Sequence, residues 1–192
     1  TLHSLAFKVV KTYASSLGLS SHLEAFDLSA RTGSVLGGMF IGDLHVGART
    51  SGHVSSKNEL NRAIDEIQPH WQVADRVPAP ANDVDTDVTT LCGIYQAMPW
   101  DRLVPTANDA IEQFGLPKWL HDAKHFLIDE YQDFNPAEQR LIELISEPSD
   151  SVVIVGDVDQ SIYSGRSASP EGLLTLLGRT DVSTVNLSLI HI

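Results

Sequence analysis

The sequence predicts an α/β fold built around a parallel sheet. Two short apolar runs, at residues 126–128 and 152–155, are each followed by an amphipathic helical pattern, and STVNL at residues 183–187 could form a third strand. Runs that are apolar at consecutive positions are typical of strands covered on both faces, as in parallel sheets. The order strand, helix, strand, helix, strand therefore predicts such a sheet in the C-terminal half of the chain.

The N-terminal half begins with a helical pattern. Residues 1–17 place apolar side chains at helical spacing, and Gly18 is typical of the residue that ends a helix. From residue 29 to residue 56 the composition shifts to Gly, Ser and Thr, with β-prone pieces such as MFIGDLHV. These residues predict one helix followed by a weakly patterned segment.

A further helix and a loop are expected next. Ser56 and Glu59 have the spacing of a capping box ahead of an apolar face, which predicts a helix in SSKNELNRAIDEI. Residues 77–88, VPAPANDVDTDV, are expected to form a loop with solvated acids, because Pro breaks regular structure and like charges repel.

Two helix starts carry recognisable caps. Residues 106–114 predict a short helix with Thr106 and Asp109 as its cap. The segment NPAEQRLIELIS has a more complete start, with Asn135 as the N-cap, proline in the first turn and Glu138 three residues after the cap. We expect this helix to begin directly after the first strand and its acidic end.

Composition limits the class of protein. The chain has 192 residues, of which 42% are hydrophobic and 20% charged, which is typical of a soluble globular protein. No apolar run is long enough to span a membrane. The single cysteine, Cys92, allows no internal disulfide and favours a reducing, cytoplasmic location.

The net charge of −12 argues against a generally basic surface for nucleic acid, so any contact with nucleic acid would be local. The start at Thr1, inside a helical pattern, leads us to expect a fragment of a longer chain.

Acidic residues follow both predicted strands. Asp129 and Glu130 end the first strand, and Asp157 follows the second. Ligands of open parallel sheets bind at the carboxyl ends of the strands. One carboxylate there could hold Mg²⁺ while its neighbour deprotonates an attacking water, a division of labour suited to nucleoside-triphosphate hydrolysis. From this pair alone, a simple surface-exposed strand end is an equally good interpretation.

The loop after the second strand adds residues of another kind. In VGDVDQSIYSGRSA, Gln160 could sense a terminal phosphate through its amide, and Tyr163 could stack on a nucleic-acid base. A loop that carries both side chains would connect a nucleotide site to a nucleic-acid strand, which favours the catalytic interpretation of the acidic pair.

The motifs DEYQDFN and VGDVDQSIYSGRSA resemble motifs II and III of the UvrD/Rep/PcrA-type superfamily 1 DNA helicases, and TLHS at the start resembles their motif Ib. The resemblance covers residues 1–17 and 124–178. It implies a RecA-like P-loop NTPase core in which residues 1–28 and 106–192 form part of the first RecA-like ATPase domain. The same resemblance implies a mostly helical inserted subdomain at residues 29–105.

The resemblance also implies a role for each motif residue. Asp129 would coordinate Mg²⁺, Glu130 would be the catalytic base, and Gln160 would contact the γ-phosphate and take part in catalysis. Tyr163 would stack on a DNA base, and Arg166 would bind nucleotide and DNA and couple the two sites.

Further residues and ligands follow from the same resemblance. Thr1 and His3 would contact the DNA backbone, while Gln132 and Asp133 would have a supporting role near the phosphates. The implied cofactors are ATP and Mg²⁺, and the implied partners are single-stranded DNA and DNA duplex junctions. The activity would be ATP-driven translocation and duplex unwinding, in a process such as DNA repair.

Departures from the family pattern leave alternatives open. Gly165 stands where the family usually has an aromatic residue, so one stacking platform is missing. No GxxxxGK(S/T) phosphate loop occurs in the sequence, so we expect this chain by itself to hydrolyse ATP negligibly. The alternatives are the helicase subunit of a helicase–nuclease recombination complex and a non-catalytic DNA-binding relative. A weaker one is a metal-dependent nuclease that uses Asp129, Glu130 and Asp157.

Overall fold

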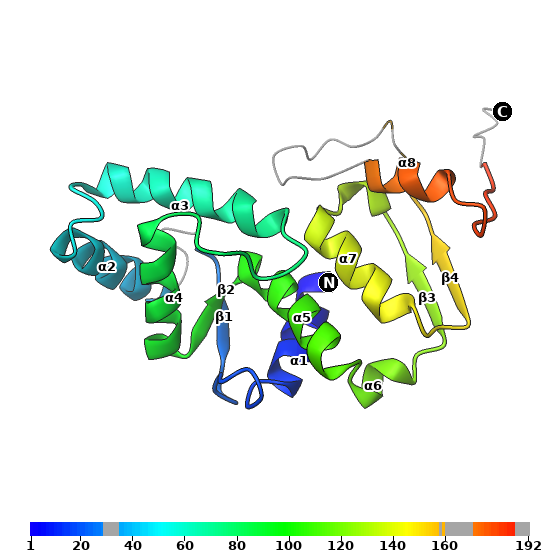
Figure 1. Cartoon of the computed structure of the whole chain (residues 1–192), viewed down its shortest axis with the longest axis horizontal. Helices are drawn as coiled ribbons and strands as arrows, with labels where there is room; N and C mark the ends of the chain where they lie inside the picture. The colour runs from blue at the N-terminus through cyan, green and yellow to red at the C-terminus, as the bar shows by residue number, and fades with distance from the viewer. Residues whose placement is uncertain (29–34, 158, 160–170, 187–192) are drawn as a thin grey trace.

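The computed structural model describes residues 1–28, 35–157, 159 and 171–186. Along the chain its elements are α1 (Leu2–Thr12), β1 (Glu24–Phe26), α2 (Val35–Thr50), α3 (Lys57–Gln72), α4 (Asp83–Tyr95), β2 (Ala97–Pro99), α5 (Trp100–Phe114), α6 (Lys118–His121), β3 (His125–Ile128), the 3₁₀ turn η1 (Tyr131–Asp133), α7 (Pro136–Ser146), β4 (Ser151–Ile154) and α8 (Glu171–Leu177). Figure 1 shows α2, α3 and α4 at one end of the molecule and β3, β4, α7 and α8 at the other, with α1 and α5 between them.

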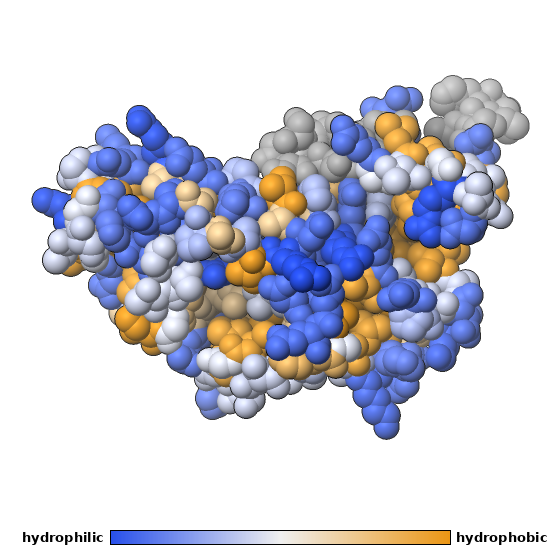
Figure 2. Space-filling view, viewed as in Figure 1, coloured by the Kyte–Doolittle hydropathy of each residue, from blue (hydrophilic) through white to orange (hydrophobic). Residues whose placement is uncertain are grey.

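Parallel strand pairing is present, as the sequence predicts. β3 pairs with β4 in parallel, with His125 opposite Ser151 and Ile128 opposite Ile154, and β1 pairs with β2 in the same sense. The predicted burial of these strands on both faces is wrong, because Leu127 remains 75% exposed. Within the described residues the β3–β4 sheet has two strands, and 183–186 are not a strand. In Figure 2 hydrophobic surface is visible among hydrophilic residues on the side where β3 and β4 lie.

A first hydrophobic cluster lies where α1, α5 and α7 meet. Val9 of α1, Leu103 of α5 and Leu141 of α7 are all fully buried in it. α1 ends at Thr12, earlier than predicted, and Gly18 takes a positive φ of 70° in the turns that follow. This cluster fixes α7, which begins at Pro136, after the acids that follow β3 and the short turn η1.

A second hydrophobic cluster fills the space among α2, α3 and α4. We call these three helices and their connections, residues 35–95, the α2–α4 unit. The β-prone interpretation of MFIGDLHV is wrong, because this segment belongs to α2. Phe40 and Leu44 are fully buried one helical turn apart, alongside Leu60 of α3. Burial of one helical face outweighs the low helix propensity of the glycines in this segment.

The predicted loop at residues 77–88 is wrong in its second half, which forms the start of α4. Asn82 caps this helix by accepting the Asp85 N–H at 3.0 Å, and Asp85 is buried rather than solvated. Its carboxylate accepts the Ala81 N–H at 3.0 Å. Acids in a first helical turn are stabilised by the helix dipole, so alternating Asp residues after an Asn cap favour a helix start.

The predicted helix in SSKNELNRAIDEI is confirmed as α3, with Ser56 accepting the Glu59 N–H at 3.2 Å. The predicted capping box is only half formed, because the Glu59 carboxylate accepts the Ser55 N–H, at 2.7 Å, instead of the Ser56 N–H. The predicted cap at Thr106 is wrong, because α5 begins at Trp100 and the Thr106 hydroxyl donates to the Arg102 carbonyl within the helix.

The predicted domain boundary between residues 105 and 106 falls inside α5. The division into domains stays a prediction.

Candidate functional site

The carboxyl ends of β3 and β4 lie side by side. The parallel pairing continues past the strands, because the Val155 N–H donates to the Ile128 carbonyl at 2.8 Å and the Tyr131 N–H donates to the Val155 carbonyl at 3.0 Å. Asp129 and Asp157, which follow the two strands, therefore emerge at the same edge of the sheet. We call residues 129–135 the strand-end loop.

Glu130 has an uncommon backbone conformation in this loop. Its φ and ψ of 53° and 44° are left-handed, which costs a residue with a Cβ free energy and is found where surrounding contacts impose it. Asp129 supports the turn, because its Oδ1 accepts the Glu130 N–H at 3.0 Å. Both residues are exposed, so the turn presents two carboxylates to solvent.

Gln132 connects the two strand ends through its side chain. Its amide nitrogen donates to Glu130 Oε2 at 2.7 Å, and its Oε1 accepts the Asp157 N–H at 3.0 Å. Gln132 is only 1% exposed, so the Gln132 side of each bond is shielded from water. A Cβ at Gly156 would lie 2.9 Å from Gln132 Oε1, which explains why the smallest residue occupies that position.

Tyr131 and Phe134 anchor the strand-end loop on its buried side. Tyr131 is buried, and its ring meets the Phe134 ring edge-on with centroids 6.0 Å apart. Burial raises the pKa of the Tyr131 hydroxyl to about 12, so this side chain stays uncharged. The aromatic pair fixes the base of the loop while the acids stay on its outer side.

The far end of the loop is fixed by the start of α7. Asn135 accepts the Glu138 N–H and Glu138 accepts the Asn135 N–H, both at 3.0 Å, which is the predicted capping box. The other Glu138 oxygen lies 3.4 Å from His3 Nδ1 of α1. The His3 ring also packs edge-on against Trp100, with centroids 6.4 Å apart.

The predicted site residues divide into three groups. Asp129, Glu130 and Gln132 come together at the strand ends, while Thr1 caps α1 by accepting the Ser4 N–H and His3 reaches α7 rather than the strand-end loop. The remaining predicted residues lie outside the described part of the chain: Gln160, Tyr163 and Arg166. All of these functional assignments stay predictions.

Sequence reasoning gave Gln132 only a general supporting role near the phosphates. Its bridge from Glu130 to Asp157 spans the two motifs, and Gly156, directly before Asp157, is a sequence signal that could have indicated a close approach there. The Asp157 carboxylate accepts the Asp159 N–H at 3.0 Å, which is a local turn contact.

The strand-end loop offers oxygen ligands that suit Mg²⁺. Nucleotide-bound Mg²⁺ needs only one or two protein carboxylates, and Asp129 provides an exposed one. Asp133 Oδ1 is buried without a partner among the described residues, and such an oxygen is stabilised by a donor or a cation. The described residues contain no cluster of three or more His, Cys, Asp or Glu side chains suited to a metal ion.

Comparison with known proteins gives the family. The UvrD/REP helicase N-terminal domain matches residues 1–180 of the chain. The chain belongs to this family. Its mixture of helices with short parallel strands is consistent with a domain of that kind.

Curated relatives are similar over nearly all of the chain. ATP-dependent DNA helicase Rep of Salmonella typhimurium is 26% identical over 194 residues, covering 92% of this chain and 27% of the relative. ATP-dependent DNA helicase PcrA of Leuconostoc citreum and srs2 of Schizosaccharomyces pombe are also 26% identical, over 91% and 90% of this chain. The chain spans about a quarter of the length of these relatives. Within the part of the chain that the structure describes, no helix is both long and apolar enough to cross a membrane.

Proposed function

We propose that this chain is part of the first RecA-like motor domain of an ATP-dependent DNA helicase. In the complete protein it would couple hydrolysis of Mg²⁺-bound ATP to translocation on single-stranded DNA and to unwinding at duplex junctions. The observation that supports this most strongly is the pair of exposed carboxylates at the strand ends, one of which Gln132 holds to the neighbouring strand. The single cysteine, Cys92, suits a cytoplasmic location, and DNA repair is a process in which such an activity serves.

The strand-end loop supplies two separate functions in this proposal. Asp129 would hold Mg²⁺, which when bound neutralises charge on the transferred phosphoryl group. Glu130 would accept a proton from the attacking water, as an exposed carboxylate on an adjacent backbone position can do without competing for the metal. The remaining phosphate contacts, including those of a phosphate loop, would come from Gln160 and from other parts of the complete protein.

Gln132 would orient the base. The 2.7 Å bond from its amide nitrogen engages one Glu130 oxygen and leaves the other for the water. Because the same side chain accepts the Asp157 N–H, a movement of the loop after β4 would shift Gln132 and thereby the Glu130 carboxylate. That loop carries Tyr163, the proposed base-stacking residue.

The DNA would contact the start of α1 locally. Thr1 and His3 lie in its first turn, and the 3.4 Å approach of His3 to Glu138 connects that turn to the helix that follows the strand-end loop. A local contact is compatible with the net charge of −12, because phosphate contacts need only a few well-placed donors.

The decisive experiment measures ATP hydrolysis by the full-length protein with and without single-stranded DNA. Glu130→Gln should retain ATP binding and lose about 10²- to 10⁴-fold in turnover, the range for a general base. Glu147→Gln, an exposed substitution at the other end of α7, is the matched control and should behave as wild type. Wild-type turnover in Glu130→Gln would remove Glu130 as the base.

The same measurements separate the alternatives. Hydrolysis without stimulation by DNA would count against the motor, and no hydrolysis in wild type would favour a non-catalytic DNA-binding relative. DNA cleavage with Mg²⁺ and no ATP would favour a nuclease that uses Asp129, Glu130 and Asp157. A helicase–nuclease complex subunit would show DNA-stimulated hydrolysis and co-purify with a nuclease.

A further inference from the structure

The segment that leaves α3 is bound to α5 by two backbone contacts. Asn108 Nδ2 donates to the Asp75 carbonyl at 2.8 Å, and Asp109 Oδ2 accepts the Val77 N–H at 3.1 Å. We call residues 75–77 the return segment, because it leads from α3 back across α5 before α4 begins. Side chains of α5 therefore fix the path of the chain between two helices of the α2–α4 unit.

Asn108 also reaches α7. The same Nδ2 donates to the Ala137 carbonyl at 3.0 Å, and Asn108 is fully buried. One amide group thus bridges the return segment and the first turn of α7. Because the bond to Ala137 is buried, loss of this group would leave the Ala137 carbonyl without a partner, while the bond to Asp75 is only partly buried.

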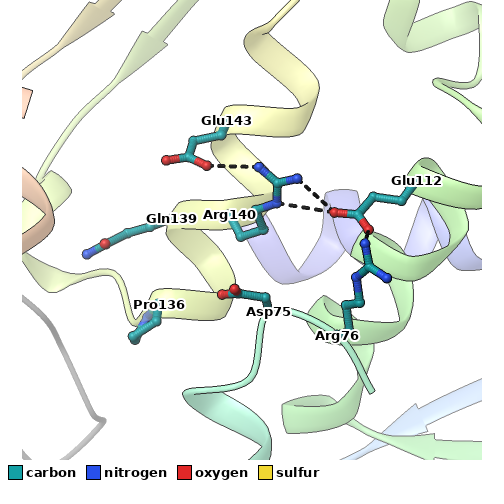
Figure 3. A pocket seen from close by; sticks show the side chains of 7 residues that line it. All are labelled: Asp75, Arg76, Glu112, Pro136, Gln139, Arg140 and Glu143. Atoms are coloured by element: carbon teal, nitrogen blue, oxygen red, sulfur yellow. Dashed lines mark hydrogen bonds and ion pairs between the residues drawn. The ribbon is translucent and has the colours of Figure 1, made fainter. Parts of the chain in front are cut away.

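A row of charged side chains forms a second, outer bridge. The Glu112 carboxylate binds Arg76 of the return segment and accepts from Arg140 of α7 at 2.8 Å, and Arg140 also binds Glu143 at 3.1 Å. Figure 3 shows these side chains converging from three parts of the chain around one pocket. Hydrogen bonding from Arg140 lowers the pKa of Glu112, so its carboxylate stays ionised in this bridge.

The Asn108 bridge ends close to the strand-end loop, and the outer bridge ends farther along α7, at Arg140 and Glu143. Ala137 lies in the first turn of α7, directly after the Asn135 cap that ends the loop. Figure 2 shows strongly hydrophilic surface in the middle of the molecule, where the return segment passes α5 and α7. Since the loop is short and capped, a shift of the first turn of α7 must move Glu130 or strain the cap.

We propose that Asn108 is a positioning residue through which the α2–α4 unit sets the position of the strand-end loop, with the Glu112 bridge in support. This inference rests on the proposed function for its catalytic consequence. The mechanical connection itself rests on the contacts of Asn108 and, in support, on the ion pairs of Glu112.

Amide hydrogen exchange in the full-length protein without nucleotide tests the mechanical connection. In Asn108→Ala, exchange should rise about 10- to 100-fold both in residues 75–77 and in the strand-end loop, as loss of buried hydrogen bonds implies. Asn82→Ala is the matched control, because Asn82 caps α4 and donates to the Ala63 carbonyl at 3.3 Å within the same unit. It should raise exchange in α4 and leave the strand-end loop unchanged. Faster exchange confined to residues 75–77 in Asn108→Ala would overturn the proposal.

A second variant guards against misfolding of Asn108→Ala. The Arg76 side chain is 67% exposed, so Arg76→Ala should fold, and it removes only the outer bridge to the return segment. It should raise exchange in the strand-end loop about twofold to fivefold, as expected for one exposed ion pair. If Asn108→Ala does not fold, unchanged exchange in Arg76→Ala overturns the proposal.

ATP hydrolysis at saturating single-stranded DNA supplies the catalytic readout. Asn108→Ala should lower kcat and leave the KM for ATP nearly unchanged, because Glu130 acts on the water rather than on ATP binding. Equal loss of ATP affinity and kcat would indicate general disruption and overturn the positioning role. If Glu130→Gln hydrolyses ATP as wild type, the proposed function fails while the exchange result stands.

Discussion

The strand-end loop and the α2–α4 unit are held in place by different kinds of contact. In the loop, polar side chains bind one another and the backbone: Gln132 binds Glu130 and accepts the Asp157 N–H, and Asn135 and Glu138 cap each other. In the α2–α4 unit the helices pack around a buried apolar cluster, and a contact such as that of His53 Nδ1 with Asp87 Oδ2, at 2.7 Å, joins segments far apart in the sequence.

The difference shows what a short motif can encode. A motif sets local geometry, such as the left-handed turn at Glu130 and the cap that follows it. The α2–α4 unit depends instead on a buried apolar cluster and on contacts between segments that only the fold brings together. Each half should therefore respond to substitution in its own way, apart from the connection through Asn108.

Truncation of one core residue in each half gives the largest expected effect. Leu141 and Ile64 are both essentially fully buried, in the α1–α5–α7 cluster and the α2–α4 cluster respectively. Leu141→Ala and Ile64→Ala should each lower the free energy of unfolding by about 2–5 kcal/mol. Amide exchange in the full-length protein should show Leu141→Ala loosening α7 and the strand-end loop, and Ile64→Ala loosening mainly α3 and α4. Identical exchange patterns would mean that the two clusters behave as one.

Two glycines test the same comparison with a smaller effect. A Cβ at Gly156 would lie 2.9 Å from Gln132 Oε1 and 3.0 Å from Leu173 Cδ2, so Gly156→Ala should cost about 1–3 kcal/mol and loosen the strand-end loop. A Cβ at Gly42 of α2 would meet nothing within 4 Å, so Gly42→Ala should add about 0.5–1 kcal/mol of stability. Denaturant unfolding of the full-length protein measures both. A neutral or stabilising Gly156→Ala would contradict the close packing at Gly156, and a destabilising Gly42→Ala would contradict the open space at Gly42.

The sequence predicted the strand-end half well because its signals are local. Each apolar run, of β3 and of β4, and the capping box at Asn135 and Glu138 is encoded in a few consecutive residues, and the helix between the two runs predicts their parallel pairing. Exposure of Leu127 could not be predicted, because burial of a strand depends on which segments cover the sheet.

The α2–α4 half was harder to predict for a physical reason. The helix of α2 exists because Phe40 and Leu44 are buried against other helices, although its glycines favour no helix. The bridge through Asn108 joins residues 33 and 29 positions away, and a lone Asn in a helical pattern carries no signal of it. Asp85 likewise looked like one solvated acid among three until its buried position at the start of α4 was known.

The smallest expected effect is a pH dependence confined to the α2–α4 unit. The hydrogen bond between His53 Nδ1 and Asp87 raises the pKa of His53 above 6.5, and the negative charge of Asp83 raises it further. A raised pKa means that the protonated form is stabilised by folding, so this contribution is complete below pH 6.5 and is lost as pH rises through the higher folded pKa. Because both side chains of the pair remain partly accessible to solvent, we expect only a slight change in stability. Titration of His53 by NMR should show its pKa falling toward 6.5 in Asp87→Asn, while amide exchange in the strand-end loop stays the same at every pH. A loop that responded to this titration would show that local charge in the α2–α4 unit reaches Glu130, which would make the two halves less independent than their contacts imply.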